Sequence, residues 1–425
     1  MGQFGRPLDK RDSAIQDPCI KLQNLTNLSG LNTLSRQLIV LLAATSALGP
    51  AAMQILLPAL PVIQETFAIS NDVAQLTLSL SMLAIALGTL FYGPLSDKYG
   101  RKPVMLLGLC ITFLGSIACL FADTIEWLIL GRFVQAFGGA VGMVLARAIV
   151  RDIYEAEDAA RVIATLVMVM VVIPMLSPAL GGELMARFGW YSVFTVIACF
   201  STILFAVLLF TLPETLKESA PFEGVGAMLS TFALLLKSPA FRSYALCVSF
   251  VSVVFFSFIS AAPEIMVSVL NRPPTEYGYY FVMIPIGFMG GNYATRILGK
   301  RLNINEMISY GGSIAIFGIA IAIALQLTGL THPITLFAPI ALAVFGNGIT
   351  LPNAQAAAIN EFPQFAGSAS GLTGFLQMAL SAIAAQTVAL IFNGTVFPLL
   401  LLMLTASALS LGLFHIGMSV KSQTA

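Results

Sequence analysis

The chain has 425 residues, of which 58% are hydrophobic and only 10% charged, and its formal net charge is +1. Ordinary soluble domains contain about 25% charged residues, so a soluble fold could not bury this much apolar surface. Two unusually apolar soluble domains are also disfavoured, because the apolar residues occur in runs of about 20, the length of a helix that crosses a bilayer. The small net charge argues against a nucleic-acid partner. We therefore expect a protein that crosses a membrane several times.

Twelve apolar runs follow a polar first segment. We interpret residues 1–35 as a cytoplasmic tail and not as a signal peptide, because the apolar run that follows is longer than a signal-peptide core. The twelve predicted helices span residues 36–57, 73–93, 103–121, 126–148, 161–185, 191–212, 242–263, 277–298, 307–327, 333–359, 366–391 and 394–418. A membrane barrel is excluded, because these runs do not alternate polar and apolar residues.

The longest interior loop divides the predicted helices into two sets of six. The expected parts are a six-helix bundle at 36–212, a cytoplasmic linker at 213–241, a second six-helix bundle at 242–418 and a cytoplasmic tail at 419–425. The stretch GPLSDKYGRK after the second helix has a counterpart, GNYATRILGKR, after the eighth. Duplicated bundles often place a substrate site at their interface. The pattern therefore favours a transporter.

The distribution of cations predicts the orientation. With the N-terminus inside, 18 of the 21 Lys and Arg residues fall in cytoplasmic segments, as the positive-inside rule requires. An even number of helices then places both termini in the cytoplasm. Neither the five cysteines nor the two histidines have metal-ligand spacing, so we expect no metal and no cofactor.

One short stretch, FYGPLSDKYGRKPVM from Phe91, gathers charges between two apolar runs. We expect its glycines, Gly93 and Gly100, to allow close backbone approach and a tight turn. Asp97 can pair with a cation or with a helix N-terminus, and Arg101 faces lipid and cytoplasm, as does Lys102, which follows it. Such contacts suit an inner gate that forms and breaks. The alternative is a basic loop that serves only to fix orientation.

This stretch resembles the signature Gly-x-x-x-Asp-Arg/Lys-x-Gly-Arg-Arg/Lys of the major facilitator superfamily, in its expected place between helices two and three. Further similarity lies in LPALPVIQETF, GRFVQAFGGA, SPALGG, LPNAQAAAI and AGSASGLTGFLQ. Together they resemble the Bcr/CflA branch of the drug:proton antiporters, which are bacterial inner-membrane exporters. The resemblance implies an all-α fold of twelve transmembrane helices in two pseudo-symmetric bundles.

Helix four carries an arginine inside the predicted span. Arg132 lies about six residues from the helix start, where a charge is costly unless it is paired or hydrated, and Gln135 follows one turn later. In the family that the chain resembles, these two residues face the cavity and interact with helix one. The alternative is an arginine that snorkels to the outer surface. With Met53, Gln54 and Asn353, the pair is expected to line a substrate cavity.

Helix five contains two prolines and two glycines close together, at Pro174, Pro178, Gly181 and Gly182. Proline removes a backbone hydrogen bond and glycine removes side-chain bulk, so we expect a bend that acts as a hinge or a seal. The group resembles the antiporter motif of the superfamily, although Ser177 stands where a glycine is usual. An ordinary proline kink is the alternative.

Proton coupling requires a side chain that can gain and lose a proton. Relatives often carry an aspartate in helix one at the position of Gln54, and an amide cannot titrate. Glu264, near the outer end of helix seven, is the acid we expect to couple protons, although it can equally be a solvated loop acid. The expected function is proton-driven export of small amphipathic compounds, including drugs, by a monomer in contact with membrane lipid. The alternatives are a specific metabolite exporter or facilitator without proton coupling, and a membrane sensor. An enzyme is not expected, because no catalytic group lies inside the spans.

Overall fold

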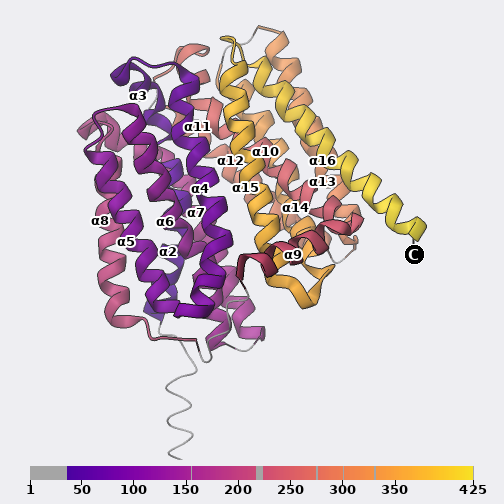
Figure 1. Ribbon diagram of the computed structural model, residues 1–425. Helices are drawn as coiled ribbons and strands as arrows, with labels where there is room; N and C mark the ends of the chain where they lie inside the picture. The colour runs from indigo at the N-terminus through magenta and orange to yellow at the C-terminus, as the bar shows by residue number, and fades with distance from the viewer. Residues whose placement is uncertain are drawn as a thin grey trace, which may run out of the picture.

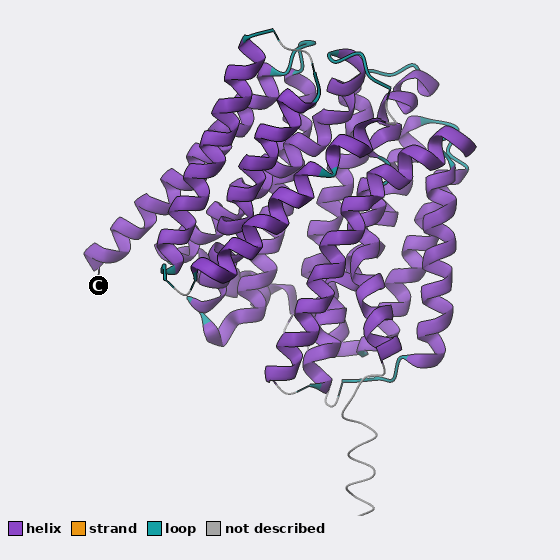
Figure 2. Ribbon diagram, turned by 180° about the vertical axis from the view of Figure 1, so that it is seen from behind, coloured by secondary structure: helices purple, strands orange, loops and turns teal. Residues whose placement is uncertain are grey.

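The computed structural model describes residues 36–154, 156–216, 224–273, 276–299, 301–329 and 332–424. These residues form helices and connecting loops and no strand (Figure 2). The predicted tail at 1–35 lies outside the described residues. The helices in chain order are α2 (Arg36–Gln54), the 3₁₀ turn η1 (Leu57–Ala59), α3 (Leu60–Phe67), α4 (Asn71–Tyr99), α5 (Arg101–Leu120), α6 (Ile125–Ile153), α7 (Ala156–Phe188), α8 (Ser192–Thr211), α9 (Gly224–Lys237), α10 (Pro239–Ser268), α11 (Glu276–Phe281), α12 (Met283–Leu298), α13 (Ile304–Leu327), α14 (Ile334–Asn360), η2 (Pro363–Phe365), α15 (Ala366–Ile391) and α16 (Phe397–Thr424).

Eleven helical segments within the described ranges are long and apolar enough to cross a membrane. The remaining predicted helix, the eighth, at 277–298, is present but divided into α11 and α12 at Val282. Pro285 explains the break, because it has no N–H to donate to the carbonyl of Phe281 and its ring collides with that turn. The prediction of an all-α membrane protein is confirmed, with one crossing built from two short helices.

The helices form two groups, one from α2 to α8 and the other from α10 to α16 (Figure 1). In the first, α6 packs against α2, α4 and α5, and α7 packs against α2. In the second, α14 packs against α12 and α13, and α10 packs against α15 and α16. Between the groups, α4 lies along α15 and α7 contacts α11. We call the end at which α4 meets α5 the inner end, and the opposite end the outer end.

Two element boundaries differ from the prediction. The linker predicted at 213–241 is not only a loop, because it contains α9, which packs on α10 and α15 through the buried side chains of Phe232 and Leu235. Apolar residues at helical spacing in this segment were the signal for it. The last helix also runs on to Thr424, so most of the tail predicted at 419–425 is helical.

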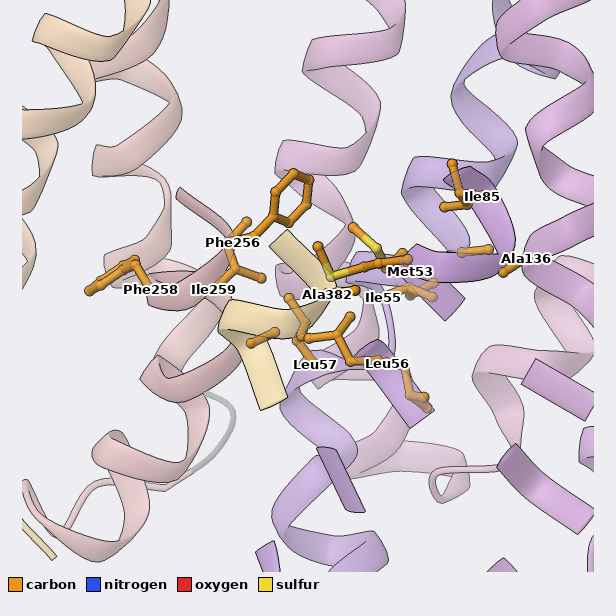
Figure 3. Packing of buried hydrophobic residues seen from close by; sticks show 14 of the residues in the cluster. Met53, Ile55, Leu56, Leu57, Ile85, Ala136, Phe256, Phe258, Ile259 and Ala382 are labelled. Atoms are coloured by element: carbon orange, nitrogen blue, oxygen red, sulfur yellow. The ribbon is translucent and has the colours of Figure 1, made fainter. Parts of the chain in front are cut away.

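The apolar core is continuous between the two groups. Side chains from the end of α2 and from η1, among them Met53 and Leu57, lie beside Phe256 and Ile259 of α10 and Ala382 of α15 (Figure 3). All five are less than a tenth exposed. The contact is dry and dispersive, so it holds the halves together without specifying polar partners.

The first crossing is broken just after Gln54. Pro58 has no N–H for the carbonyl of Gln54, and Pro61 has none for the carbonyl of Leu57, so a regular α-helix cannot continue there. The chain passes through η1 and resumes as α3. The predicted helix at 36–57 therefore extends to Phe67 as an interrupted span.

Candidate functional site: an inner gate and a buried polar centre

The signature stretch forms one turn between two helices instead of a loop. Gly93 and Asp97 belong to the last turns of α4, and Arg101 is already the first residue of α5. Gly100 alone connects the two helices, with φ of 100°. An L side chain is strained at this φ. The prediction of a tight turn is thus supported at Gly100, which joins α4 to α5 within a single residue.

Gly93 does not have the role in close packing that we expected. A Cβ atom added there would find its nearest neighbour, Val144 Cγ1, at 4.0 Å. That is ordinary van der Waals contact, so the observed packing does not require glycine at this position.

Arg101 is the centre of the inner gate. Its Nη1 atom lies 2.5 Å from Asp97 Oδ1 and donates to Ser96 Oγ at 2.6 Å. Its Nε atom donates to Asp152 Oδ2 at 2.9 Å, at the end of α6. The side chain of Arg101 is only about a tenth exposed, whereas that of Asp97 is about half exposed, so these charge-assisted contacts are shielded from water mainly on the arginine side. They connect the α4–α5 turn to α6.

Glu214, which follows α8, caps the N-terminus of α5. Its Oε1 accepts from the backbone N–H of Arg101 at 2.9 Å, and its Oε2 accepts from that of Lys102 at 3.2 Å. Partial burial acts to raise the pKa of Glu214, but the N–H groups of Leu216, Arg101, Lys102 and Thr215 together lower it below its usual value. A carboxylate at this position also interacts favourably with the helix dipole.

Two of these acids were absent from our sequence analysis. Asp152 and Glu214 are 51 and 113 positions from Arg101 in the chain. The only local sign of either residue in the sequence is an acid that follows an apolar run. Since charges at helix ends are common, this sign did not identify these acids as partners of Arg101. The contacts of Arg101 with Asp97, Ser96, Asp152 and Glu214 all lie within the first group of helices.

The buried polar centre is built around Arg132. Its side chain is 1% exposed, so it does not snorkel to the surface. Nη1 donates to Gln135 Oε1 at 2.5 Å and to the carbonyl of Ala52, on α2, at 3.0 Å. Gln135 Nε2 in turn donates to Ser116 Oγ of α5 at 2.8 Å. The expected interaction of helix four with helix one is therefore present in the structure.

The other predicted cavity residues are packed and do not surround an open space. Met53, Gln54 and Asn353 are 3%, 6% and 7% exposed. Asn353 Nδ2 donates to Ile349 O within α14 at 2.7 Å. The structure thus brings Arg132 to the last turn of α2, which also carries Met53 and Gln54, while Asn353 lies in the other half.

Helix α7 meets the break in α2. A Cβ atom on Gly181 would lie 2.0 Å from the carbonyl oxygen of Ile55, so only glycine permits this approach. Pro174 and Pro178 are inside α7, which is assigned as one helix from Ala156 to Phe188 and includes Gly182. The predicted bend at these residues stays a prediction, whereas the contact between Gly181 and α2 was not foreseen.

Polar contacts join the two halves near the outer end. Gln64 Nε2 donates to Glu264 Oε2 at 2.9 Å. Gln386 of α15 accepts from Ser79 Oγ at 2.9 Å and donates to the carbonyl of Asp72 at 2.8 Å. Tyr279 of α11 donates to Glu183 of α7 at 3.0 Å. We call these contacts the outer seam. Each of these four hydrogen bonds joins one half to the other.

Glu264 is half-buried and lies beside a small cavity of about 10 Å³, lined also by Asn71, Gln75 and Ser260. Gln75 is 2% exposed, and its Nε2 has no partner among the described residues. A larger cavity of about 1000 Å³ lies at the inner end between α10, α13 and α16, away from the residues discussed above. Within the described ranges, no group of three His, Cys, Asp or Glu side chains is placed to hold a metal ion.

Comparisons with known proteins agree with this architecture. The model of the Major Facilitator Superfamily matches residues 42–385. A bicyclomycin resistance protein homolog of Haemophilus influenzae is 30% identical over 86% of this chain and 92% of its own length. Multidrug resistance protein D of Escherichia coli is 28% identical over 83% of this chain and 89% of its own length. The crystal structure of a peptide transporter superposes with a TM-score of 0.73, at 15% identity over 94% of this chain and 98% of the transporter.

The match covers both halves of the chain and the signature around Gly100, and the superposition spans nearly all the helices. It confirms the fold of two six-helix bundles and the assignment as a membrane transporter with a small-molecule substrate. The chain belongs to the major facilitator superfamily.

Proposed function

We propose that this protein exports small amphipathic compounds, drugs among them, across the bacterial inner membrane by alternating access, in exchange for protons. Export needs no covalent chemistry. The compound and the proton bind differently to the inward-open and outward-open states, and this difference drives the exchange. A monomer in contact with lipid is sufficient for this cycle.

The observation that carries the proposal is the near full-length similarity to a protein named for bicyclomycin resistance. The outer seam adds support. A two-state transporter must hold its two halves together at the end that is closed. Contacts between the halves that lie at one end meet this need. Since Gln64–Glu264 and Ser79–Gln386 each join one half to the other, the halves cannot separate at the outer end without breaking them.

The inner gate takes part through Gly93, Asp97, Gly100, Arg101 and Lys102. In the observed state Arg101 is held by acids of its own half. We propose that this group contacts the second half when the inner end closes. The cavity residues Met53, Gln54, Arg132, Gln135 and Asn353 are then exposed to either side in turn. Pro174, Pro178, Gly181 and Gly182 allow α7 to flex during this movement.

Glu264 is our candidate for proton coupling. It is a half-buried acid between the two halves, and it accepts a hydrogen bond from Gln64 of the other half. A carboxylate accepts such a bond more strongly than a protonated acid. Its protonation therefore weakens a contact that must break when the outer end opens.

A specific metabolite exporter or facilitator without proton coupling is the second candidate. One observation favours it. Gln54 cannot titrate, and Arg132, which contacts the same helix through the carbonyl of Ala52, is bonded to a backbone carbonyl and an amide instead of an acid.

Membrane placement follows from the cation distribution and is also a proposal: both termini and the Gly100 turn lie in the cytoplasm. Cysteine labelling of an exposed turn residue, such as Tyr99→Cys, checks this placement. Labelling by an impermeant reagent from the cytoplasmic side only is the expected result, and labelling from the periplasmic side contradicts it.

The decisive experiment measures transport by the purified protein in vesicles, with and without an imposed pH gradient. Its companion is a growth screen of an efflux-deficient bacterium on a panel of toxic compounds, comparing the protein with Asp97→Asn and Arg132→Ala. We expect gradient-driven transport and broader tolerance, both lost in the variants. Transport that ignores the gradient excludes proton coupling. Unchanged tolerance across the panel favours the metabolite exporter.

A further inference from the structure

Arg132 has a free hydrogen-bonding edge. Its Nη1 atom is occupied by Ala52 O and Gln135 Oε1, whereas Nε and Nη2 are buried without a partner among the described residues. The described ion pairs involve Arg101 and Arg187 and do not include Arg132. Nε and Nη2 point along the same edge of the guanidinium, and this edge binds a carboxylate through two parallel hydrogen bonds.

Among the described residues, no acidic side chain pairs with Arg132. Gln54 lies on α2 two residues beyond Ala52, and its amide is neutral. Gln54 Oε1 is itself buried without a partner among the described residues. A buried cation without a counter-charge is costly, and two nitrogen atoms of Arg132 lack partners. The region is therefore prepared for a group that accepts hydrogen bonds and carries negative charge.

The position of Arg132 suits a ligand. It contacts α2 at the last turn before the break at Gln54, and broken helices are where transporters of this general design place polar substrate groups. The Gly181 contact brings α7 to the same break. The free edge is buried in the observed state, so a ligand can reach it only when the packing around Arg132 opens.

A second cation lies on the same helix toward the inner end. Arg147 is 15 residues further along α6, or roughly 22 Å, and about 60° away around the helix axis. Its Nη2 contacts Met170 Sδ at 3.7 Å, and the described ion pairs do not include it. An anion that enters from the inner end would meet Arg147 before it reaches Arg132.

We propose that the free edge of Arg132 binds an anionic group of the transported compound, so that amphipathic carboxylates, sulfonates or phosphonates are the preferred substrates and lipophilic cations are disfavoured. This inference rests on the proposed export function and names its substrate class.

The test uses three matched probes: 1-pyrenebutyrate, its neutral amide, and a pyrenebutyl trimethylammonium ion. Their transport is measured with the full-length protein in vesicles. We expect kcat/KM for the carboxylate to exceed that for the cation by at least tenfold. In Arg132→Gln the advantage should disappear while the neutral amide is still transported. Arg132→Lys keeps the charge but loses the paired donors. In this variant we expect the advantage of the carboxylate over the cation to lie between that of the unaltered protein and that of Arg132→Gln. Arg242→Gln, at an exposed cation, is the control and should keep the advantage.

Equal transport of carboxylate and cation by the unaltered protein overturns the inference but leaves the export function standing. So does an Arg132→Gln variant that keeps the preference. Transport of none of the three probes, nor of any compound from the growth screen, overturns the export function itself. Gln54→Asp provides a readout that does not depend on removing Arg132: we expect the added carboxylate to pair with the free edge, abolish the preference for anions and make transport more pH-dependent.

Discussion

Single residues from distant parts of the chain complete the inner gate. Gly100 makes the turn, and the Glu214 carboxylate occupies the space that a side chain at position 100 would need. The same carboxylate caps α5, so turn and cap depend on each other. This explains in physical terms why a glycine stands next to two cations and opposite an acid.

Gly100→Ala tests this dependence. The added Cβ would lie 2.5 Å from Glu214 Oε2 and would be held at φ of 100°, so we expect a loss of roughly 1–3 kcal/mol in stability. Thermal unfolding in detergent measures it. Gly93→Ala is the matched control, because a Cβ there meets nothing closer than 4.0 Å. Equal melting temperatures for the two variants would contradict the structural account of Gly100.

Glu214→Gln tests the cap through its pH dependence. The pKa of Glu214 is lower in the folded protein than its usual value of 4.5. The stabilisation is therefore fully present above about pH 4.5 and is lost as the pH falls through the lower, folded-state pKa. We expect the difference in melting temperature between the two proteins to be large at pH 7 and to shrink below pH 4.5. If the difference in melting temperature did not change with pH, the negative charge of Glu214 would not be the cause of the stabilisation.

Glu264→Gln separates proton coupling from the outer seam. The amide oxygen can still accept from Gln64, so the contact should persist, while the ionisable group is gone. We expect transport driven by a pH gradient to fall to the rate without a gradient, and transport down a substrate gradient to continue. Glu65→Gln, at a neighbouring exposed acid, is the control. Unchanged gradient dependence in Glu264→Gln would remove this acid from the coupling route.

At the scale of elements, two of the crossings are interrupted. The first crossing breaks after Gln54 and the eighth breaks at Val282, and in both cases proline removes a backbone donor just beyond the break. Helix α7 contacts both broken crossings, through Gly181 on α2 and through Ala179 facing Gly278 of α11. A single helix therefore connects the two interruptions, which suits an element that transmits movement.

Gly181→Ala tests the role of α7. Its Cβ would lie 2.0 Å from Ile55 O, a backbone atom that cannot move aside alone. We expect a loss of about 1–3 kcal/mol in stability, as for other overpacked sites, together with reduced transport. Gly374→Ala in α15 is the control, since nothing lies within 4 Å of the added atom. Full activity and stability in Gly181→Ala would mean that the helices separate there at little cost.

At the scale of the whole molecule, the two halves are joined by the dry core shown in Figure 3 and by the outer seam. Apolar packing has no preferred direction and can slide, whereas each seam hydrogen bond must break before the outer end opens. We therefore propose that the seam controls which end is closed.

A cross-link across the seam tests this control. Ser79→Cys and Gln386→Cys are introduced together in a background without the native cysteines. They replace a hydrogen-bonded pair in which Ser79 Oγ lies 2.9 Å from Gln386 Oε1. A short thiol cross-linker should join them and stop transport, and a cleavable linker should restore transport after cleavage. Cross-linked protein that continues to transport would show that the outer end opens elsewhere.

Much of the architecture could be predicted from local features of the sequence. Apolar runs predicted the membrane crossings, because each helix satisfies its own backbone hydrogen bonds and is driven into lipid by its own side chains. The turn at Gly100 was predicted for a similar reason, since glycine conformation is a property of one residue. The positions of Pro58 and Pro61 in the sequence also indicate the break after Gln54, although we had expected an uninterrupted helix.

Only the tertiary structure placed Asp152 and Glu214 on Arg101, joined Gln64 to Glu264, and left one edge of Arg132 without a partner. These contacts depend on how separate helices rotate and pack. Neither an acid nor an arginine carries information in the chain about which distant group it will meet. Hydrophobicity acts on one helix at a time and is readable along the sequence, whereas pairing depends on the whole packed arrangement.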